Sequence, residues 1–213
     1  MSSLIAYWNT PRHIAQLTAA LGEHVALVSV TLVCSLVLAA VITVIALRSH
    51  AGERVIMQVL SASYAIPSLA LFSLLIPFTG LGFTSAAIVL VLYNQFILVQ
   101  NALEGIHGVD ASVVQAAQGM GMSPIQIMLQ VQLPLALPAL MGGLRLAALS
   151  TIGIATIAST IGAGGLGDIL FSGLRTMNLD KILGGTLACA ALALAADAAL
   201  RLAEYIARKR LYR

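Results

Sequence analysis

The sequence predicts an all-α integral membrane protein with about five transmembrane helices. Hydrophobic residues make up 60% of the 213 positions and charged residues only 9%, against roughly 45–50% and 25% in an average soluble domain. The mean hydropathy of +0.99 agrees, and several apolar runs reach the roughly 20 residues that cross a bilayer. This composition excludes a soluble enzyme, a disordered protein and a disulfide-rich secreted module. A formal net charge of only +3 argues against a nucleic-acid-binding protein.

Five apolar segments account for the predicted spans, and we expect one transmembrane domain over residues 1–213. Each segment is long enough to cross the hydrocarbon core as a helix. Pro67 and Pro77 interrupt the second segment, and Arg145, whose role is not predicted, lies in the fourth. The segments cover residues 25–47, 55–78, 85–103, 135–161 and 182–206.

Opposite charges are spaced for pairing near the end of the fifth segment. Asp197 precedes Arg201 by four residues, and Glu204 precedes Arg208 by the same distance. This spacing brings two side chains together on one helix face. We interpret these residues as structural ion pairs, with a proton relay through Asp197 as the alternative.

Cysteine and histidine predict no special chemistry. Cys34 and Cys189 both lie inside apolar runs, where a free cysteine acts as a small packing residue. The four histidines have no ligand-like spacing with cysteine, aspartate or glutamate. We therefore predict neither a disulfide framework nor a metal site.

The basic residues predict the orientation of the chain. Cytoplasmic loops are enriched in Lys and Arg, and five spans place the two chain ends on opposite sides. With the N-terminus outside and the C-terminus in the cytoplasm, eight basic residues lie inside and three outside. Residues 104–134 then form a long cytoplasmic stretch, and residues 78–84 and 162–181 are external. The inner residues are Arg48, Arg54, Arg145, Arg201, Arg208, Lys209, Arg210 and Arg213, and the outer ones are Arg12, Arg175 and Lys181.

The cytoplasmic stretch begins with signals for a short helix. Asp110 is suited to cap a helix that starts at Ala111, because its carboxylate can accept a free backbone N–H. Gly119 and Gly121 then end that helix, since glycine tolerates the left-handed turn of a helix terminus. We expect the stretch to form the first half of a helical hairpin.

A second helix is predicted directly after the bend. Ser123 as the cap, Pro124 at the first helical position and Gln126 three residues after the cap form a capping box. We expect this helix to end before Leu133 and Pro134, where the fourth span begins.

The bend between the two helices exposes Met120 and Met122. Methionine at an exposed turn suits an adaptable hydrophobic contact with a partner. The alternative is a hairpin that only caps the bundle, and the chemistry of these residues leaves both interpretations open.

The hairpin also carries a recognisable spacing. An Ala-Ala pair, a glycine and a Leu-Pro pair resemble the Glu-Ala-Ala motif of permease subunits in binding-protein-dependent ABC importers. The sequence departs from that motif at Gln115, where the family has Glu, and at Val131, where it has Ile. The matching segments are Gln115-Ala116-Ala117, Gly121 and Val131-Gln132-Leu133-Pro134.

A later stretch extends the resemblance. Residues 152–158 and 161–168 are similar to the corresponding part of osmoprotectant importer permeases, which take up glycine betaine, carnitine or choline. The resemblance covers roughly residues 55–178. It implies a type I ABC importer permease fold in a bacterial inner membrane and a transport subunit rather than an enzyme.

The resemblance also implies partners. They are an ATP-binding subunit, a second permease subunit in a homo- or heterodimer, and an extracytoplasmic substrate-binding protein; no nucleic acid is expected. The ATP-binding subunit would hold ATP and Mg²⁺, and we expect no cofactor in this chain. The residues implied at the coupling surface are Gln115, Ala116, Ala117, Gly119, Gly121, Met122, Leu133 and Pro134.

Two glycine patterns bear on nucleotide binding. No GxxxxGK[ST] motif is present, and neither Lys181 nor Lys209 follows a glycine-rich loop. If transport is driven by ATP, the ATPase must therefore be another chain. Residues 162–167 satisfy GxGxxG, but a dinucleotide site needs this motif between a strand and a helix. We expect these glycines to let the backbone turn and pack closely at the outer mouth.

Polar and aromatic residues in the second and third segments are candidates for the translocation path. We assign Tyr64, Ser68, Tyr93 and Asn94 to the path, because polar side chains inside spans tend to face a cavity and because aromatic faces can hold a trimethylammonium cargo. Polar side chains can instead serve contacts between helices. A permease for another small solute such as an amino acid, an ion-coupled carrier or channel, and a scaffold without transport are the alternatives.

Overall fold

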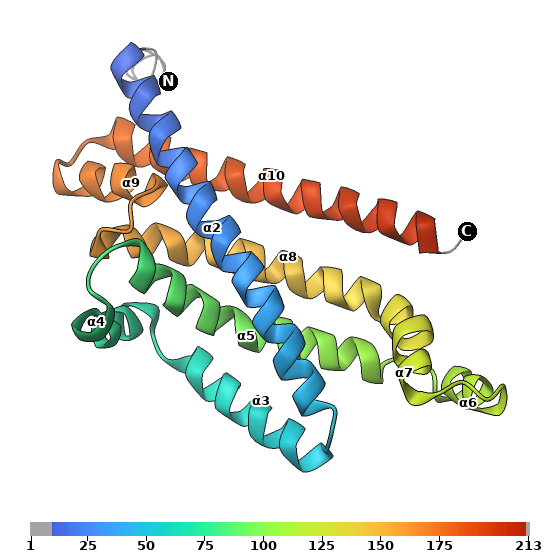
Figure 1. Cartoon of the computed structure of the whole chain (residues 1–213). Helices are drawn as coiled ribbons and strands as arrows, with labels where there is room; N and C mark the ends of the chain where they lie inside the picture. Colours follow the sequence, from blue (N-terminus) through green and yellow to red (C-terminus); the bar gives the residue numbers. More distant parts are fainter. Residues whose placement is uncertain (1–9, 212–213) are drawn as a thin grey trace.

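The structure is a bundle of long helices from which a short helical hairpin projects at one end (Figure 1). This computed structural model describes residues 10–211, which contain no strand. The predicted all-α class is confirmed. In chain order the elements are α2 (Pro11–Ala46), α3 (His50–Ala65), α4 (Ser68–Thr79), α5 (Phe83–His107), α6 (Ala111–Gly119), α7 (Pro124–Ile127), the π-helical turn η1 (Met128–Gln132), α8 (Leu133–Ala158), the 3₁₀ turn η2 (Ser159–Ile161), α9 (Leu166–Arg175) and α10 (Leu179–Leu211).

Four helical runs in the described part of the chain are long and apolar enough to cross a membrane, and a bent pair supplies a fifth. The four are α2, α5, the run Pro124–Ile161 and the run Leu179–Arg210. The prediction of about five spans is confirmed, but α2 begins at Pro11 rather than near residue 25. Its 36 residues extend over about 54 Å, so one end of α2 protrudes from a hydrocarbon core of about 30 Å.

The second predicted span is a bent pair, α3 and α4, which meet at 96°. Pro67 causes the break, because the residue before a proline is driven to extended backbone, and Ile66 has a ψ of 129°. Pro77 lies inside α4 without ending it. One of the two prolines therefore divides the span and the other does not.

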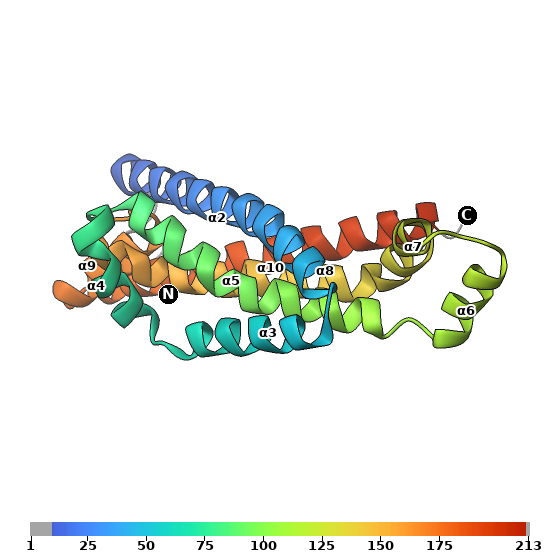
Figure 2. The ribbon, with the colours of Figure 1, turned by 60° about the horizontal axis from the view of Figure 1, so that its bottom comes forward.

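Helix α5 lies at the centre of the bundle and contacts α2, α3, α4 and α8. Figure 2 shows it between α2 and α3. In the most apolar window of α5, 56% of the residues are buried, compared with 6% in α10. The main core cluster joins Phe72 of α4, Leu90 of α5 and Ile152 of α8. The side chains on each face of α5 therefore determine whether its contact with a neighbouring helix is polar or apolar.

The glycine-rich loop before α9 packs against α2. Gly165 has a φ of +89°, which favours glycine, and its N–H donates to the Glu23 carboxylate at 2.9 Å. A Cβ at Gly167 would lie 2.1 Å from the carbonyl oxygen of Thr156. The loop joins two helical elements, which agrees with its interpretation as a close-packed turn.

Helix α10 is attached to α8 by an ion pair that the sequence did not reveal. Arg145 Nη1 lies 3.7 Å from Glu204 Oε2, and Arg208 Nη1 lies 3.9 Å from Glu204 Oε1. Arg201 donates to Asp197 at 2.6 Å. The predicted pairs within the fifth span are confirmed, and Arg145 acquires a structural role.

Candidate functional site

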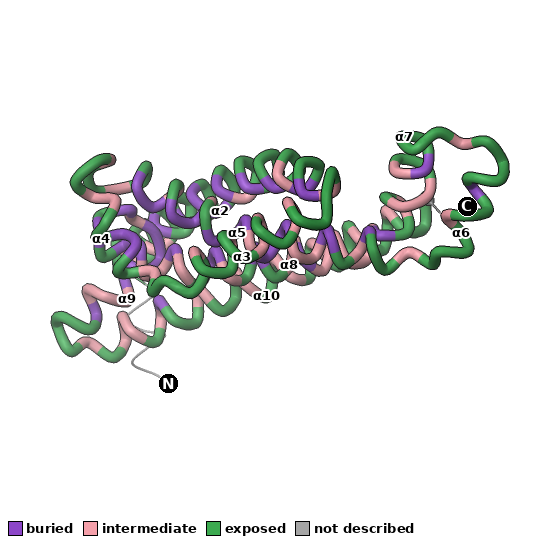
Figure 3. Tube along the Cα trace, turned by 90° about the horizontal axis from the view of Figure 1, so that it is seen from below, coloured by how far each residue is buried: buried purple, intermediate pink, exposed green. Residues whose placement is uncertain are grey.

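The hairpin of α6 and α7 projects beyond the ends of α5 and α8, and its surface is mostly exposed (Figure 3). Asp110 caps α6 as predicted, because its carboxylate accepts the Ser112 N–H at 2.8 Å. This bond lowers the pKa of Asp110 by stabilising the ionised carboxylate. The helix starts where the sequence indicated.

The bend after α6 also follows the predicted chemistry. Gly121 has a φ of +80°, and the capping box at α7 is complete. The Gln126 N–H donates to Ser123 Oγ at 3.3 Å, and the Ser123 N–H donates to Gln126 Oε1 at 2.8 Å. Met120 is 75% exposed at the tip. The hairpin therefore presents a rigid turn with a flexible apolar side chain.

The prediction that the second hairpin helix ends before Leu133 and Pro134 was wrong. The helix continues through η1 into α8 as one run, Pro124–Ile161. In a regular α-helix the proline ring clashes with the carbonyl one turn earlier. The π-helical turn η1 immediately precedes this point and accommodates the ring by its wider hydrogen-bond spacing. The hairpin is thus rigidly continuous with a membrane-crossing helix.

The residues assigned to the coupling surface fall into two groups. Those of α6 and the bend are exposed, except for Ala117, which is buried, and Met122, which is half-buried. The Met122 N–H donates to the Ala117 carbonyl at 3.2 Å, so these two residues brace the turn from inside. Leu133 and Pro134 lie in the stem, at the start of α8. The exposed members are Gln115, Ala116, Gly119 and Gly121.

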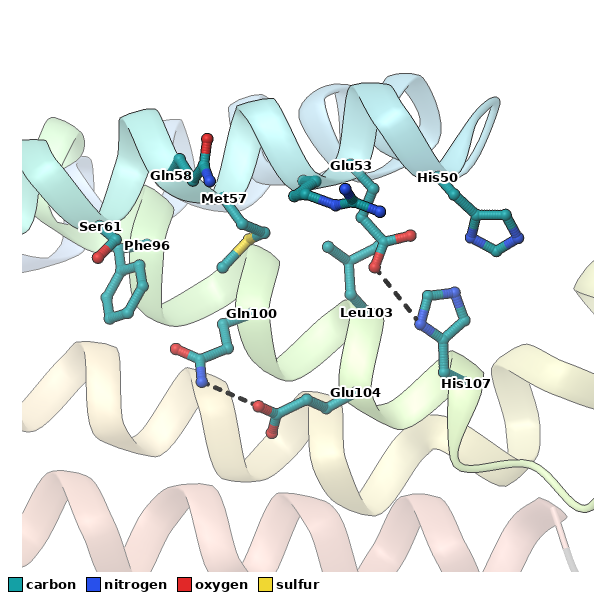
Figure 4. A pocket seen from close by; sticks show the side chains of 11 residues that line it. His50, Glu53, Met57, Gln58, Ser61, Phe96, Gln100, Leu103, Glu104 and His107 are labelled. Carbon is teal, nitrogen blue, oxygen red and sulfur yellow. Dashed lines mark hydrogen bonds and ion pairs between the residues drawn. The ribbon is translucent and has the colours of Figure 1, made fainter.

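A polar groove with a volume of about 930 Å³ lies between α3 and α5, close to the hairpin (Figure 4). One ion pair and one hydrogen bond connect side chains that line it. His107 Nδ1 lies 3.6 Å from Glu53 Oε1, and Gln100 Nε2 donates to Glu104 Oε1 at 2.8 Å. The groove therefore combines two carboxylates with neutral and basic groups on facing helices.

An aromatic cluster continues this groove along the same two helices. The ring centroids of Tyr64 and Phe96 are 5.1 Å apart, and those of Tyr64 and Tyr93 are 5.5 Å apart with an edge-to-face arrangement. The Tyr93 hydroxyl donates to the Ile66 carbonyl at the bend between α3 and α4. Because Phe96 also lines the groove, the rings and the carboxylates form one continuous surface.

Sequence reasoning missed most of this groove, although its signal is periodic. On α5 the lining residues Phe96, Gln100 and His107 recur at helical spacing, which places them on one face. On α3 the residues His50 and Met57 follow the same period. The spacing therefore marks a polar face on each of the two helices, but it does not show that these faces meet.

The other residues assigned to the path have different surroundings. Asn94 is 1% exposed, and its side-chain amide donates to Ser35 Oγ at 3.2 Å and to Thr151 Oγ1 at 2.9 Å. This geometry joins α2, α5 and α8, so it favours a helix contact over a place on the path. Tyr93 is buried with its hydroxyl engaged at the bend, Ser68 is half-buried at the start of α4, and Tyr64 is exposed. Their assignment to the path stays a prediction.

Known proteins are similar to this chain in sequence and in fold. Residues 35–212 match the family described as binding-protein-dependent transport system inner membrane component. The carnitine transport permease OpuCB of Listeria monocytogenes is 39% identical over 74% of this chain and 72% of its own length. The choline transport permease OpuBB of Bacillus subtilis is 34% identical over 85% of this chain and 84% of its own length.

A solved structure of the MetNI methionine ABC transporter, in an inward-facing conformation, shows the same fold. Its TM-score is 0.85 at 19% identity, covering 93% of this chain and 99% of that one. The chain belongs to the family of inner membrane components of binding-protein-dependent transport systems, and it is a permease subunit of an ABC importer.

Proposed function

We propose that this permease forms the path for quaternary-ammonium osmoprotectants such as glycine betaine, carnitine or choline. The observation that carries the proposal is the continuous surface along α3 and α5, from the Tyr64 ring cluster to the carboxylates of Glu53 and Glu104. Relatives named for carnitine and choline transport support the same cargo class.

The groove suits this cargo for a chemical reason. A quaternary ammonium group has no N–H, so it is held by aromatic faces and by nearby negative charge rather than by hydrogen bonds. Tyr64 and Phe96 provide the ring faces, and Glu53 and Glu104 provide the charge. Arg54 also lines the groove, where it can attract the carboxylate of glycine betaine or carnitine. The groove is open, which fits weak and transient binding during passage.

The hairpin of α6 and α7 is proposed to dock onto a separate ATP-binding subunit that holds ATP and Mg²⁺. Its exposed residues Gln115, Ala116 and Gly121, together with Met120, offer a small rigid surface with one adaptable apolar side chain. Because the helix runs unbroken from Pro124 into α8, movement of the docked hairpin is transmitted directly to a membrane-crossing helix. This continuity supports a coupling role.

The proposed orientation places the hairpin and the C-terminus in the bacterial cytoplasm and the N-terminus outside. Arg48 follows directly after the C-cap of α2, and Arg54 lines the polar groove close to the hairpin. Their position at this end follows the enrichment of basic residues on the cytoplasmic side. Arg213 of the predicted inner set lies outside the described residues.

The full importer is proposed to contain two permease chains, as a homo- or heterodimer, with an extracytoplasmic substrate-binding protein. The groove between α3 and α5 is open along one side. A second permease chain would close it and complete the path.

Uptake of labelled cargo tests the proposal. The chain is expressed with its neighbouring transport subunits in cells that lack osmoprotectant uptake, and glycine betaine, carnitine, choline and methionine are compared. We expect uptake of at least one quaternary-ammonium compound and none of methionine. Uptake of methionine alone would overturn the proposed cargo, and uptake that continues without an ATP-binding subunit would overturn the importer mechanism.

A further inference from the structure

A second groove lies on a different side of α5 from the polar groove. It is bounded by α2, α5 and the run formed by α7, η1 and α8, and its volume is about 720 Å³. Its walls are apolar except for Thr43 and Arg48, and Arg48 is the only charged residue among those that line it. The groove is therefore apolar along most of its length and cationic at one end.

The apolar part of the groove is accessible to the bilayer. Leu36 and Val44 of α2 line it and are 41% and 58% exposed, and Leu129 on the opposite wall is 58% exposed. Helix α2 is one of the membrane-crossing helices, so these side chains lie within reach of lipid. Apolar walls that face an empty space lack dispersion contacts, and an acyl chain in the groove would supply them.

Arg48, at the charged end of the groove, indicates which polar head group a bound molecule would carry. Arg48 follows the C-cap Leu47 of α2, where a basic side chain can extend to the membrane interface. Among the described residues, no carboxylate lies within ion-pair distance of Arg48. Guanidinium groups bind phosphate through paired N–H donors. A molecule with a phosphate head and an apolar tail therefore matches the groove at both ends.

We propose that a phospholipid from the leaflet beside the coupling hairpin binds in this groove, with an acyl chain between α2 and α8 and its phosphate on Arg48. One wall consists of Ile125, Leu129 and Leu133, which belong to the hairpin and its stem. The bound lipid therefore contacts the segment that connects the hairpin to α8. This site is independent of which solute the permease carries.

Native mass spectrometry of the intact transporter tests the site. The complex is purified with its partner subunits, depleted of lipid and titrated with phosphatidylglycerol. Ala40 is exposed and lines the groove, so Ala40→Trp fills it from the mouth without disturbing the core. Val41 is 52% exposed and is not among the lining residues, so Val41→Trp is the matched control.

We expect one phosphatidylglycerol per permease chain in the wild type and in Val41→Trp, and none in Ala40→Trp. Arg48→Gln should weaken binding about tenfold, the effect of one hydrogen bond to a charged group. Diacylglycerol with the same acyl chains should bind the wild type as weakly as phosphatidylglycerol binds Arg48→Gln.

Two results would overturn the proposal. Equal phosphatidylglycerol binding by the wild type, Ala40→Trp and Arg48→Gln would show that the lipid binds elsewhere. Separation of the two permease chains by Ala40→Trp, with phosphatidylglycerol binding unchanged, would identify the groove as a subunit interface. Because Arg48 is exposed at a helix end, its variant remains informative if the tryptophan variant does not fold.

Discussion

The two grooves beside α5 differ in chemistry although they share one helix. Gln100 and Glu104 line the polar groove towards α3, whereas Leu98, Ala102 and Ile106 line the apolar groove towards α2 and α8. Residues three or four apart lie on the same face of a helix, so this 25-residue element separates two environments. The comparison teaches that polar side chains of a membrane helix can be confined to one face, which lines a polar groove, while another face lines an apolar one.

The polar side chains deeper in the bundle follow a different rule. Asn94 and Thr151 bond to each other between α5 and α8, where a neighbouring helix supplies the partner. Such contacts stabilise helix association in the bilayer. Polarity in a membrane span therefore indicates a path only when the side chain faces a cavity.

The largest expected effect comes from reversing a charge in the polar groove. Glu104→Lys should lower choline uptake at least tenfold, because a cation replaces the negative charge that we propose attracts the cargo. Glu104→Gln is the control and should retain more uptake than the lysine variant. Initial rates of labelled choline uptake at equal membrane expression measure the effect. Equal rates in the wild type and both variants would show that the groove does not take part in transport.

A smaller effect is expected from the aromatic end of the same surface. Tyr64→Ala removes a ring that stacks with Phe96 and Tyr93, and it should raise the apparent KM for choline about two- to fivefold, the range of an exposed cation–π contact. Tyr64→Phe keeps the ring face and should preserve the KM. A KM that responds equally to both variants would point to the hydroxyl group instead.

The ion pair between α8 and α10 lies outside both grooves. Removing it tests whether a loss of stability leaves transport through the polar groove unchanged. Arg145→Gln should lower the Tm of the detergent-solubilised protein by about 2–4 °C, corresponding to roughly 1 kcal/mol, because Glu204 then keeps Arg208 as its one ion-pair partner among the described residues. Differential scanning fluorimetry measures the shift. The choline KM should not change, and a changed KM would connect this pair to the path.

The smallest effect concerns the pH dependence of stability at helix α9, which carries Asp168. Partial burial and the nearby Glu23 raise the pKa of Asp168, and Arg175 opposes the shift. Because the folded-state pKa is raised, the stabilising contribution of Asp168 is present below its unfolded pKa and is lost as pH rises through the folded value. Asp168→Asn should remove this decline of Tm between acidic and neutral pH, and an unchanged pH profile would contradict this account.

The local chemistry of the hairpin could be predicted from the sequence because its signals are short-range. Asp110, Ser123 and Gln126 cap helices within three residues of themselves, so no knowledge of distant contacts is needed. The same holds for the bend at Gly121. The continuity of the second helix into α8 was missed because a proline normally ends or kinks a helix, and nothing local announces a π-helical turn.

The grooves could not be derived from the sequence in the same way, because they depend on which faces of distant helices meet. Glu53 and His107 are far apart in the chain and come together only when α3 packs on α5. Arg145 likewise finds Glu204 across two helices. Hydrophobic periodicity locates spans but does not determine their neighbours.

ATP-dependent transport in proteoliposomes tests the central claim most directly. The assembled importer is reconstituted with its binding protein and labelled glycine betaine, and the wild type is compared with Gly121→Asp. The position has a left-handed backbone at the exposed bend, and a bulky charge there should block docking while leaving membrane insertion intact. We predict ATP-dependent accumulation by the wild type and none by the variant. Full accumulation by Gly121→Asp would contradict the coupling role of the hairpin.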